Sequence, residues 1–331
     1  MKKMKYRVLG RTGFQVSELG FGGHEYRRPL PTTLGRWGAI DLEQFRKGQF
    51  RRNHLIKRAI DVGINFFDVT QPEEHKSLGY ALKETNARER VHVAIMILRP
   101  FDQILDKPIG EWQQFLFDDV TEKLALLQSN YADILTVHMP EISFSRKRLL
   151  AALEVFTDLQ REGRIRRLGA SSHHIRFLTE MIRKYDCFDS VMVRYNYHLQ
   201  EARDVLFPLC KACDIGVVVM KPFAWPYYGI PFMHFSPIPH DPTTLTPAQT
   251  SLRWILNTPE VGTVVPGMNS ERELNENLNT FDERESNPQL LEQSLRAAQS
   301  EQAQRTLEHL VNDSAVDRQH FAKRAISDLT R

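Results

Sequence analysis

The sequence predicts an α/β fold, a closed (β/α)8 barrel of the TIM type, preceded by a β-hairpin and followed by a helical C-terminal tail. Short runs of β-branched residues alternate strictly with amphipathic stretches, which favours parallel strands joined by helical crossovers. Eight such units fit within 331 residues, a length that suits one closed barrel.

The hairpin comes first, where Tyr6–Leu9 and Phe14–Val16 flank the turn residues Gly10–Gly13. The first barrel strand follows near Glu18–Gly22. Clusters of β-branched and other apolar residues predict seven more strands, at Ile64–Asp68, Val91–Ile97, Ile134–His138, Ile165–Ser171, Ser190–Arg194, Gly216–Lys221 and Gly262–Pro266. Apolar residues at helical spacing predict the intervening helices, which include Trp112–Gln128, Lys147–Arg161, Ile175–Lys184, Arg203–Ala212, Pro247–Asn257 and Ser270–Asn279.

Two long segments interrupt the repeat after predicted strands. Glu25–Phe50 is rich in arginine, proline and glycine, and Phe223–Pro247 is rich in proline and aromatic residues. Long loops at the strand ends of a barrel commonly shape its substrate pocket. Beyond residue 281 the sequence is polar and helix-prone. We therefore expect residues 1–281 to form the barrel with its hairpin and residues 282–331 to form a helical C-terminal extension.

The composition restricts the expected partners. The net charge is only +3, and the densest basic clusters, Arg46–Arg52 and Arg161–Arg167, are expected to be solvated helix faces, so no nucleic-acid partner is expected. No apolar run reaches transmembrane length and the N-terminus lacks a signal-peptide core, which predicts no membrane partner and a cytoplasmic location. Cys210 and Cys213 have CxxC spacing, but without a second cysteine pair we expect two buried helix thiols.

Five segments together carry a family resemblance: Tyr6–Gly23, Gly63–Asp68, Gly163–Ser172, Val219–Phe223 and Val265–Met268 with Glu276 and Asn277. On these segments the chain resembles the aldo-keto reductases. The resemblance implies a (β/α)8 barrel that binds NADP or NAD in an extended form, with NADP slightly favoured, and that reduces a carbonyl by hydride transfer. No G-x-G-x-x-G motif lies between a strand and a helix. The implied substrate is a small carbonyl compound or sugar, and the oligomeric state is left open.

The resemblance implies four catalytic side chains, and two of them are present. Asp68 matches the family's aspartate, and His138 matches the histidine that orients the carbonyl. The positions of the tyrosine acid and of its activating lysine read Glu73 and Met96. A buried carboxylate needs a cation or hydrogen-bond donors, so we expect Asp68 to be hydrogen-bonded inside the barrel mouth. The candidate partners are His138, His24 and Lys76.

Two functions remain open on this pattern. One is an NAD(P)H-dependent oxidoreductase of aldo-keto reductase type with a non-standard proton donor, for which the candidates are His138, His75, Glu73, Tyr26, Tyr227 and Tyr228. The other is a catalytically inactive relative that binds NAD(P) or a metabolite as a sensor or scaffold. A third, metal-assisted reaction would need ligands among His24, Glu25, Asp68, Glu73, His75 and His138; their spacing is not diagnostic, and no metal site is expected.

The cofactor residues that the resemblance implies lie at the ends of the later strands. Ser171 and Ser172 occupy the positions that hold the nicotinamide carboxamide, and they are equally suited to cap the following helix. In Met220-Lys221-Pro222, methionine replaces the ring that stacks on the nicotinamide, and Lys221 is placed to reach the pyrophosphate.

Towards the adenine end of the cofactor, Glu276 and Asn277 match the family. The lysine and serine that grip a 2′-phosphate read Gly267 and Met268, and the following arginine position reads Glu273. Arg272, one position earlier, is the candidate replacement for that arginine.

Overall fold

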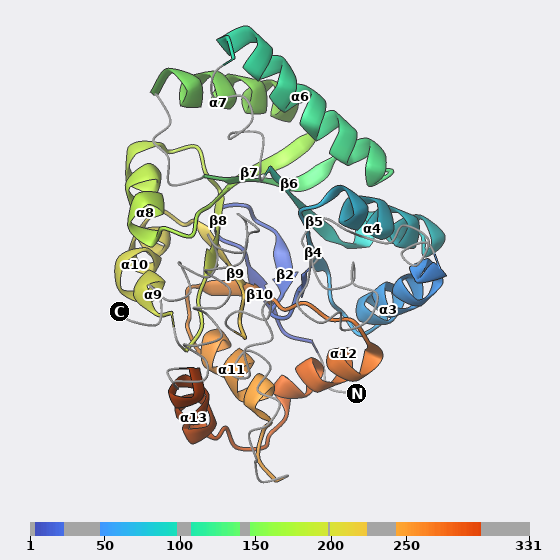
Figure 1. Cartoon of the computed structure of the whole chain (residues 1–331), viewed down its shortest axis with the longest axis vertical. Helices are drawn as coiled ribbons and strands as arrows, with labels where there is room; N and C mark the ends of the chain where they lie inside the picture. Colours follow the sequence, from blue (N-terminus) through green and yellow to red (C-terminus); the bar gives the residue numbers. More distant parts are fainter. Residues whose placement is uncertain are drawn as a thin grey trace, which may run out of the picture.

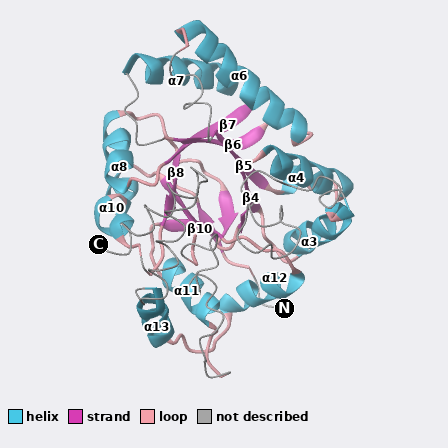
Figure 2. Ribbon diagram, in the orientation of Figure 1, coloured by secondary structure: helices cyan, strands magenta, loops and turns pink. Residues whose placement is uncertain are grey.

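Eight parallel strands form one sheet that curves into a barrel, and helices surround it (Figure 1, Figure 2). The computed structural model describes residues 4–22, 47–97, 107–139, 146–197, 199–223 and 243–298. The strands lie in the order β3-β4-β5-β6-β7-β8-β9-β10. Parallel bridges from Leu19 to Val264 and from Gly22 to Gly267 bring the first and last strands together. The predicted (β/α)8 fold class is confirmed.

Each predicted strand is present, and β7 and β8 have the predicted bounds. The barrel strands are β3 Phe21–Gly22, β4 Phe66–Val69, β5 His92–Ile97, β6 Ala132–His138, β7 Ile165–Ser171, β8 Ser190–Arg194, β9 Gly216–Met220 and β10 Val261–Val265. The described helices are α3 Gln49–Asp61, α4 Pro72–Glu84, α6 Ile109–Leu126, α7 Arg146–Arg161, α8 Ile175–Lys184, α9 Glu201–Val205, α10 Phe207–Ala212, α11 Pro247–Leu256, α12 Glu271–Leu278 and α13 Pro288–Ala298. Short 3-10 turns occupy Arg88–Arg90 and Asn279–Phe281.

The prediction of one helix over Arg203–Ala212 is wrong, because this region forms the two short helices α9 and α10. Pro208 lies in the first turn of α10, where its missing amide hydrogen costs no hydrogen bond. A proline at this position cannot continue a helix from the preceding turn, so the chain breaks at Leu206.

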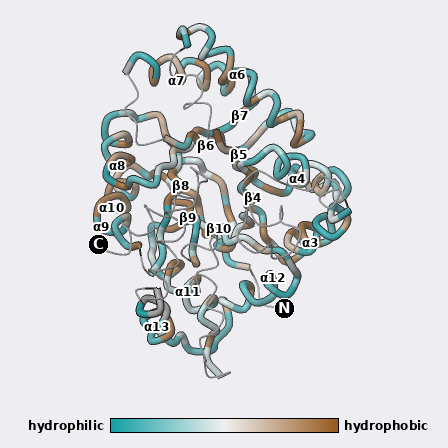
Figure 3. Tube along the Cα trace, in the orientation of Figure 1, coloured by the Kyte–Doolittle hydropathy of each residue, from teal (hydrophilic) through white to brown (hydrophobic). Residues whose placement is uncertain are grey.

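Alternate residues along each strand face opposite sides of the barrel wall. In β5, Val93, Ile95 and Ile97 pack with residues of the surrounding helices, whereas Ala94 and Met96 belong to the cluster that fills the barrel. Figure 3 shows the central strands as predominantly hydrophobic and much of the outer helical surface as hydrophilic. This alternation determines which residue at each strand end points into the mouth.

The N-terminal hairpin closes the base of the barrel. Its strands β1 (Tyr6–Val8) and β2 (Gln15–Ser17) pair antiparallel, as predicted. Leu9 and Val16 are fully buried and join the cluster inside the barrel. Gly10 forms a bridge to Ile215, and its φ of 46° lies in the left-handed region. The turn therefore depends on glycine at this position, both for its backbone angle and for the close approach.

Replacing Gly10 with alanine will destabilise the hairpin far more than the same change at Gly13. Both residues have positive φ, but a Cβ at Gly10 would overlap the backbone of Asp214, Ile215 and Gly216, whereas a Cβ at Gly13 meets nothing within 4 Å. We expect a loss of about 3 kcal/mol of unfolding free energy for Gly10→Ala and about 1 kcal/mol for Gly13→Ala, measured by urea denaturation. Equal losses would show that the close approach to Gly216 does not exist.

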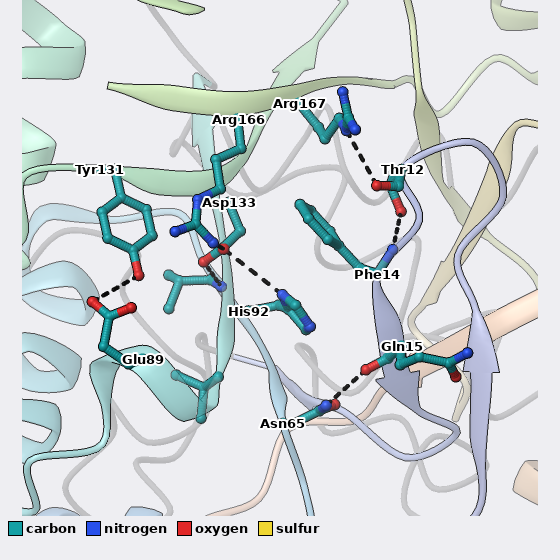
Figure 4. Close-up of polar contacts among 12 residues, drawn as sticks. Thr12, Phe14, Gln15, Asn65, Glu89, His92, Tyr131, Asp133, Arg166 and Arg167 are labelled. Carbon is teal, nitrogen blue, oxygen red and sulfur yellow. Dashed lines mark hydrogen bonds and ion pairs between the residues drawn. The ribbon is translucent and has the colours of Figure 1, made fainter. Parts of the chain in front are cut away.

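A buried ionic network ties three strands together at the amino-terminal end of the barrel (Figure 4). Asp133, only 1% exposed, accepts hydrogen bonds from Arg88 Nη2 at 2.9 Å and from Val93 N at 2.9 Å, and it pairs with Arg166 Nη1 at 3.0 Å. The guanidinium carbons of Arg88 and Arg166 lie 4.0 and 4.1 Å from the centre of the Tyr131 ring. A network at this end of a barrel serves stability rather than catalysis.

The prediction that the two basic clusters are solvated helix faces is wrong in part: Arg51 in α3 and Arg161 in α7 are exposed, but other arginines of the clusters are not on such faces. In the second cluster, Arg166 and Arg167 belong to β7, and Arg167 Nε donates to Thr12 O at 3.2 Å (Figure 4). In the first, Arg52 is only 3% exposed and its Nε donates to Ser77 Oγ at 2.8 Å, which joins α3 to α4. These arginines fasten elements of the fold to one another.

The prediction of two buried thiols in the CxxC pair is right for Cys210 and wrong for Cys213. Cys210 is 1% exposed, and burial raises the pKa of its thiol to about 12. Cys213 is exposed, because α10 ends at Ala212. Both thiols are free, and the thiol of Cys210 is inert at neutral pH.

The described part of the C-terminal extension is helical and packs on the barrel. Helix α13 lies beside α11 (Figure 1), with Leu290 and Leu291 buried, and Glu292 accepts a hydrogen bond from Tyr197 Oη. The division of the chain after residue 281 stays a prediction, and residues 299–331 lie outside the described ranges. Within those ranges, no helix is long and apolar enough to cross a membrane.

Candidate active site

The candidate site lies where the barrel strands end at their carboxyl edge. Asp68, His138, Ser171 and Met220 occupy β4, β6, β7 and β9, and all four follow the inward-facing alternation. Their adjacency is direct for His138 and Ser171, which are partners in the β6–β7 register. Loops at this face carry the active sites of barrel enzymes.

Asp68 is buried, as predicted, with 7% of its surface exposed. It follows Phe66 and Phe67, which are fully buried, and it pairs in register with Gly22 on β3. A carboxylate placed in this way adds negative charge to a mouth that also contains basic side chains. The predicted partner His24 lies outside the described residues.

His138 is half-buried and contacts Ser171 through its side chain. Its Nδ1 lies 3.2 Å from Ser171 Oγ, and the serine hydroxyl is fully buried. This contact orients the imidazole through its Nδ1.

Of the two positions of the missing catalytic pair, Met96 has a structural role and Glu73 lies next to a helix cap. Met96 is 4% exposed, fills the barrel interior and lies 4.0 Å from Thr70 Oγ1 through its sulfur. Glu73 lies in the first turn of α4, beside Glu74, whose Oε2 accepts from Thr70 N and Gln71 N and so caps that helix. The start of α4 is therefore built around a carboxylate cap.

His75, a sequence candidate for the proton donor, is fully buried in α4. Its Nδ1 lies 2.7 Å from Gln71 O. Burial lowers its pKa from the ordinary value to about 4, so the ring is neutral at physiological pH. A buried neutral imidazole within a helix is poorly placed to protonate a substrate.

The structure adds two basic residues to the mouth that the sequence interpretation missed. His173 follows the serine pair, and its Nε2 lies 3.1 Å from Lys221 Nζ. Its ring meets that of His138 edge-on, with centroids 5.1 Å apart. Arg194, 7% exposed at the end of β8, donates from Nη2 to His173 O at 2.9 Å. The inward position of Arg194 could have been predicted from the sequence. Arg194 lies two residues after Met192, which faces the barrel interior, and alternate residues of a strand face the same side.

The turn after β9 is held in an unusual conformation. Lys221 has a φ of 56°, in the left-handed region, and its carbonyl accepts a hydrogen bond from Asn196 Nδ2 at 2.9 Å. Asn196 is 1% exposed and pairs with Leu199 through its backbone. Pro222, the next residue, is buried, and its carbonyl accepts from Ser251 Oγ at 2.9 Å. A lysine in this conformation persists only where its surroundings impose it.

The serine pair divides between two partners. Ser171 contacts His138, whereas Ser172 Oγ accepts from His174 N at 3.1 Å. Helix α8 begins at Ile175 with His174 as its N-cap and no side-chain cap hydrogen bond, so the prediction that the serines cap this helix is wrong. A hydroxyl keeps donor and acceptor capacity beyond one such contact. The two hydroxyls and the half-buried thioether of Met220 are the groups here that could hold the carboxamide and ring of a nicotinamide.

At the start of α12, the polar groups are already engaged. Glu273 Oε2 accepts from Asn269 N at 2.5 Å, and Ser270 Oγ accepts from Glu273 N at 3.3 Å as the N-cap. Arg272 is exposed, and Met268 is fully buried. A carboxylate thus occupies the helix N-terminus, the place that otherwise favours an anionic ligand.

The remaining adenine-side residues are also built into the fold. Glu276 Oε1 accepts from Thr246 Oγ1 at 3.0 Å, and Asn277 is 4% exposed. Gly267 pairs with Gly22 where the barrel closes. The sequence candidates His24, Glu25, Tyr26, Tyr227 and Tyr228, with most of both long loops, lie outside the described residues. Among the residues that are described, no group of three possible ligands is arranged to hold a metal ion.

Comparison with known proteins is decisive for the family. Residues 35–227 match the Aldo/keto reductase family. The chain belongs to the aldo/keto reductase family. Over 319 residues it is 25% identical to L-galactose dehydrogenase of Arabidopsis thaliana, covering 86% of this chain and 91% of that protein.

Solved aldo-keto reductases share the fold. The holo form of AKR11C1 from Bacillus halodurans has a TM-score of 0.64 and 21% identity, covering 89% of this chain and 96% of that one. An aldo-keto reductase from Klebsiella pneumoniae in complex with NADPH has a TM-score of 0.63 and 18% identity, covering 89% and 95%. These likenesses support the barrel in which the site has been placed.

Proposed function

We propose that this aldo/keto reductase family member is an NAD(P)H-dependent oxidoreductase that interconverts a small carbonyl compound or sugar and its alcohol, with a non-standard proton donor. The observation that carries the proposal is the position of Asp68, His138 and Ser171 at the carboxyl ends of β4, β6 and β7, with His138 in contact with Ser171. Family membership and an NADPH-bound structural neighbour support the cofactor. A cytoplasmic location, supported by three free cysteines, belongs to the same proposal.

A bound reduced nicotinamide supplies the hydride to the carbonyl carbon. The protein must orient the carbonyl and deliver a proton to its oxygen. We assign the first task to His138, whose ring is oriented by Ser171. Asp68 offsets the positive charge of the basic side chains around the mouth. Ser171, Ser172 and Met220 would hold the nicotinamide, and Lys221 directly follows Met220 at the end of β9.

The experiment that tests the proposal measures binding and then turnover. NADH and NADPH are titrated by fluorescence, and cofactor oxidation is then followed by absorbance with a panel of aldehydes, ketones and sugars. We expect saturable binding and oxidation above background with at least one carbonyl. Binding without any oxidation would instead favour the second candidate, a catalytically inactive binding protein. The specific observation behind that candidate is Met96, which fills the barrel where the family has its lysine.

We also propose that NADH binds more tightly than NADPH. The resemblance alone favours NADP. However, the Glu273 carboxylate accepts a hydrogen bond from Asn269 N at the start of α12, where the resemblance places the 2′-phosphate. The two negative charges would repel each other there. We expect Glu273→Gln to tighten NADPH binding about tenfold while NADH binding changes little, a difference of roughly 1.4 kcal/mol.

The matched control is Glu271→Gln in the same helical turn. Glu271 is exposed and pairs with His54 Nε2 at 3.0 Å, away from Asn269. We expect no change in the ratio of the two dissociation constants for this variant. A wild-type chain that binds NADPH more tightly than NADH would overturn the proposed preference.

A further inference from the structure

His173 and Lys221 form a hydrogen-bonded couple across the barrel mouth. His173 extends from the end of β7 and Lys221 from the end of β9, and His173 Nε2 lies 3.1 Å from Lys221 Nζ. Both side chains are half-buried, so the couple is close to solvent yet shielded. No role in the proposed reaction has so far been given to His173.

The contact determines which ring nitrogen of His173 carries the proton. An ammonium group has three donors and no acceptor, so Lys221 must donate and His173 Nε2 must accept. The neutral imidazole then carries its hydrogen on Nδ1. Such a ring can release the Nδ1 proton while it receives another at Nε2, which is the property of a proton relay.

The surrounding structure holds both members of the couple in place. Arg194, itself buried, fixes the backbone of His173 by donating to its carbonyl at 2.9 Å. Asn196 holds the carbonyl of Lys221 at 2.9 Å while that lysine adopts a left-handed backbone angle of 56°. A non-glycine residue in this region is strained, so the arrangement persists because other contacts impose it.

The couple also adjoins the residue assigned to the substrate. The rings of His173 and His138 meet edge-on at 5.1 Å between centroids. A substrate oxygen bound by His138 would therefore lie next to the His173 ring. Among the described donor candidates, His75 is buried in α4 and Glu73 lies in the first turn of that same helix.

We propose that His173 is the proton donor of the reaction and that Lys221 replenishes it. As the hydride reduces the carbonyl carbon, the carbon–oxygen π bond breaks and the oxygen takes the Nδ1 proton of His173. Nε2 takes a proton from the Lys221 ammonium in the same event. The product is the alcohol, the nicotinamide is oxidised, His173 is neutral with its hydrogen on Nε2, and Lys221 is a neutral amine. A proton from solvent to Lys221 and tautomer exchange restore the starting state.

This inference rests on the proposed function, but one of its tests does not need turnover. The nitrogen-15 shifts of the imidazoles report which ring nitrogen is protonated, and His173→Gln assigns the signal. In the cofactor-free wild type we expect hydrogen on Nδ1 of His173, and in Lys221→Met we expect a shift towards hydrogen on Nε2. Hydrogen on Nε2 in the wild type would overturn the couple, even if the chain is an active reductase.

The second test is kinetic and uses a carbonyl that the wild type reduces. We expect His173→Gln to lower kcat by roughly 10²–10⁴-fold while the dissociation constant of NADH changes less than about threefold. Lys221→Arg keeps the positive charge but does not give up a proton, so its kcat should fall as far as that of Lys221→Met. His174→Gln, at the adjacent half-buried histidine, should leave kcat unchanged.

The outcomes separate the two proposals. Wild-type kcat in Lys221→Arg would show that charge alone suffices and would overturn the relay. Wild-type kcat in His173→Gln would overturn His173 as the donor while the proposed reductase stands. A wild-type chain that reduces no carbonyl would overturn the proposed function together with the proton step.

Discussion

Asp133→Ala will lower the unfolding free energy by about 3 kcal/mol, because it leaves the buried charge of Arg88 without its carboxylate. Asp133 is 1% exposed, and Arg88 is 16% exposed and also lies over the Tyr131 ring. We place the loss at the lower end of the range for broken buried pairs because Arg166 is 47% exposed and can be rehydrated. Thermal denaturation should show a fall in Tm of roughly 5–10 °C.

The matched control is Asp158→Ala, which removes an exposed pair with Arg161 at 2.8 Å. Exposed pairs contribute roughly 0–1 kcal/mol, so this variant should unfold almost as the wild type does. Equal effects of the two substitutions would contradict a stabilising network at the base of the barrel.

The pH dependence of the Asp133→Ala effect follows from the same network. Burial alone would raise the pKa of Asp133, but the His92 imidazole, the Arg88 guanidinium and the Val93 amide together hold it below the usual value. His92 Nδ1 lies 3.7 Å from the carboxylate, so we attribute more of the lowering to Arg88 at 2.9 Å. A lowered folded-state pKa gives stability above the ordinary pKa of about 4, which is lost as the pH falls through the folded value. The Tm difference between wild type and variant should therefore shrink in acid.

The strands were predictable because a buried parallel strand is a short apolar run with turn residues on either side. β7 and β8 match the predicted bounds for this reason. The errors arose where residues were grouped by composition without their place in an element. The arginine run 161–167 crosses a helix end and a strand, and Cys213 lies one residue beyond α10.

The site was predictable only in part. The alternation of inward and outward residues along a strand can be worked out from the local sequence, whereas the geometry of a turn depends on contacts with distant residues. Parity alone places Asp68 and Met96 inside the barrel, and applied to β8 it would also have found Arg194. The contact between His173 and Lys221 joins residues 48 positions apart and depends on the left-handed turn at Lys221. No pattern of residue types encodes that turn, because lysine rarely adopts it.

His138→Gln is expected to lower kcat/KM for carbonyl reduction by roughly 10²–10³-fold, the effect of removing one positioned donor to a developing oxyanion. The imidazole is oriented by Ser171 Oγ at 3.2 Å, and a glutamine side chain does not reproduce both the contact and the ring. Because His138 acts on the substrate, the dissociation constant of NADH should change by less than about threefold. The loss in kcat/KM would then be confined to the chemical step.

The matched control for His138 is the same substitution at the opposite end of the barrel. His92 begins β5, and its ring stacks on Phe14 at 4.6 Å beside the Asp133 network (Figure 4). Because chemistry in these barrels occurs at the carboxyl ends of the strands, His92→Gln should lower Tm but leave kcat/KM at its wild-type value. If His92→Gln impaired turnover as strongly as His138→Gln, the loss would reflect a general disturbance of the barrel, and His138 would have no direct role at the carbonyl.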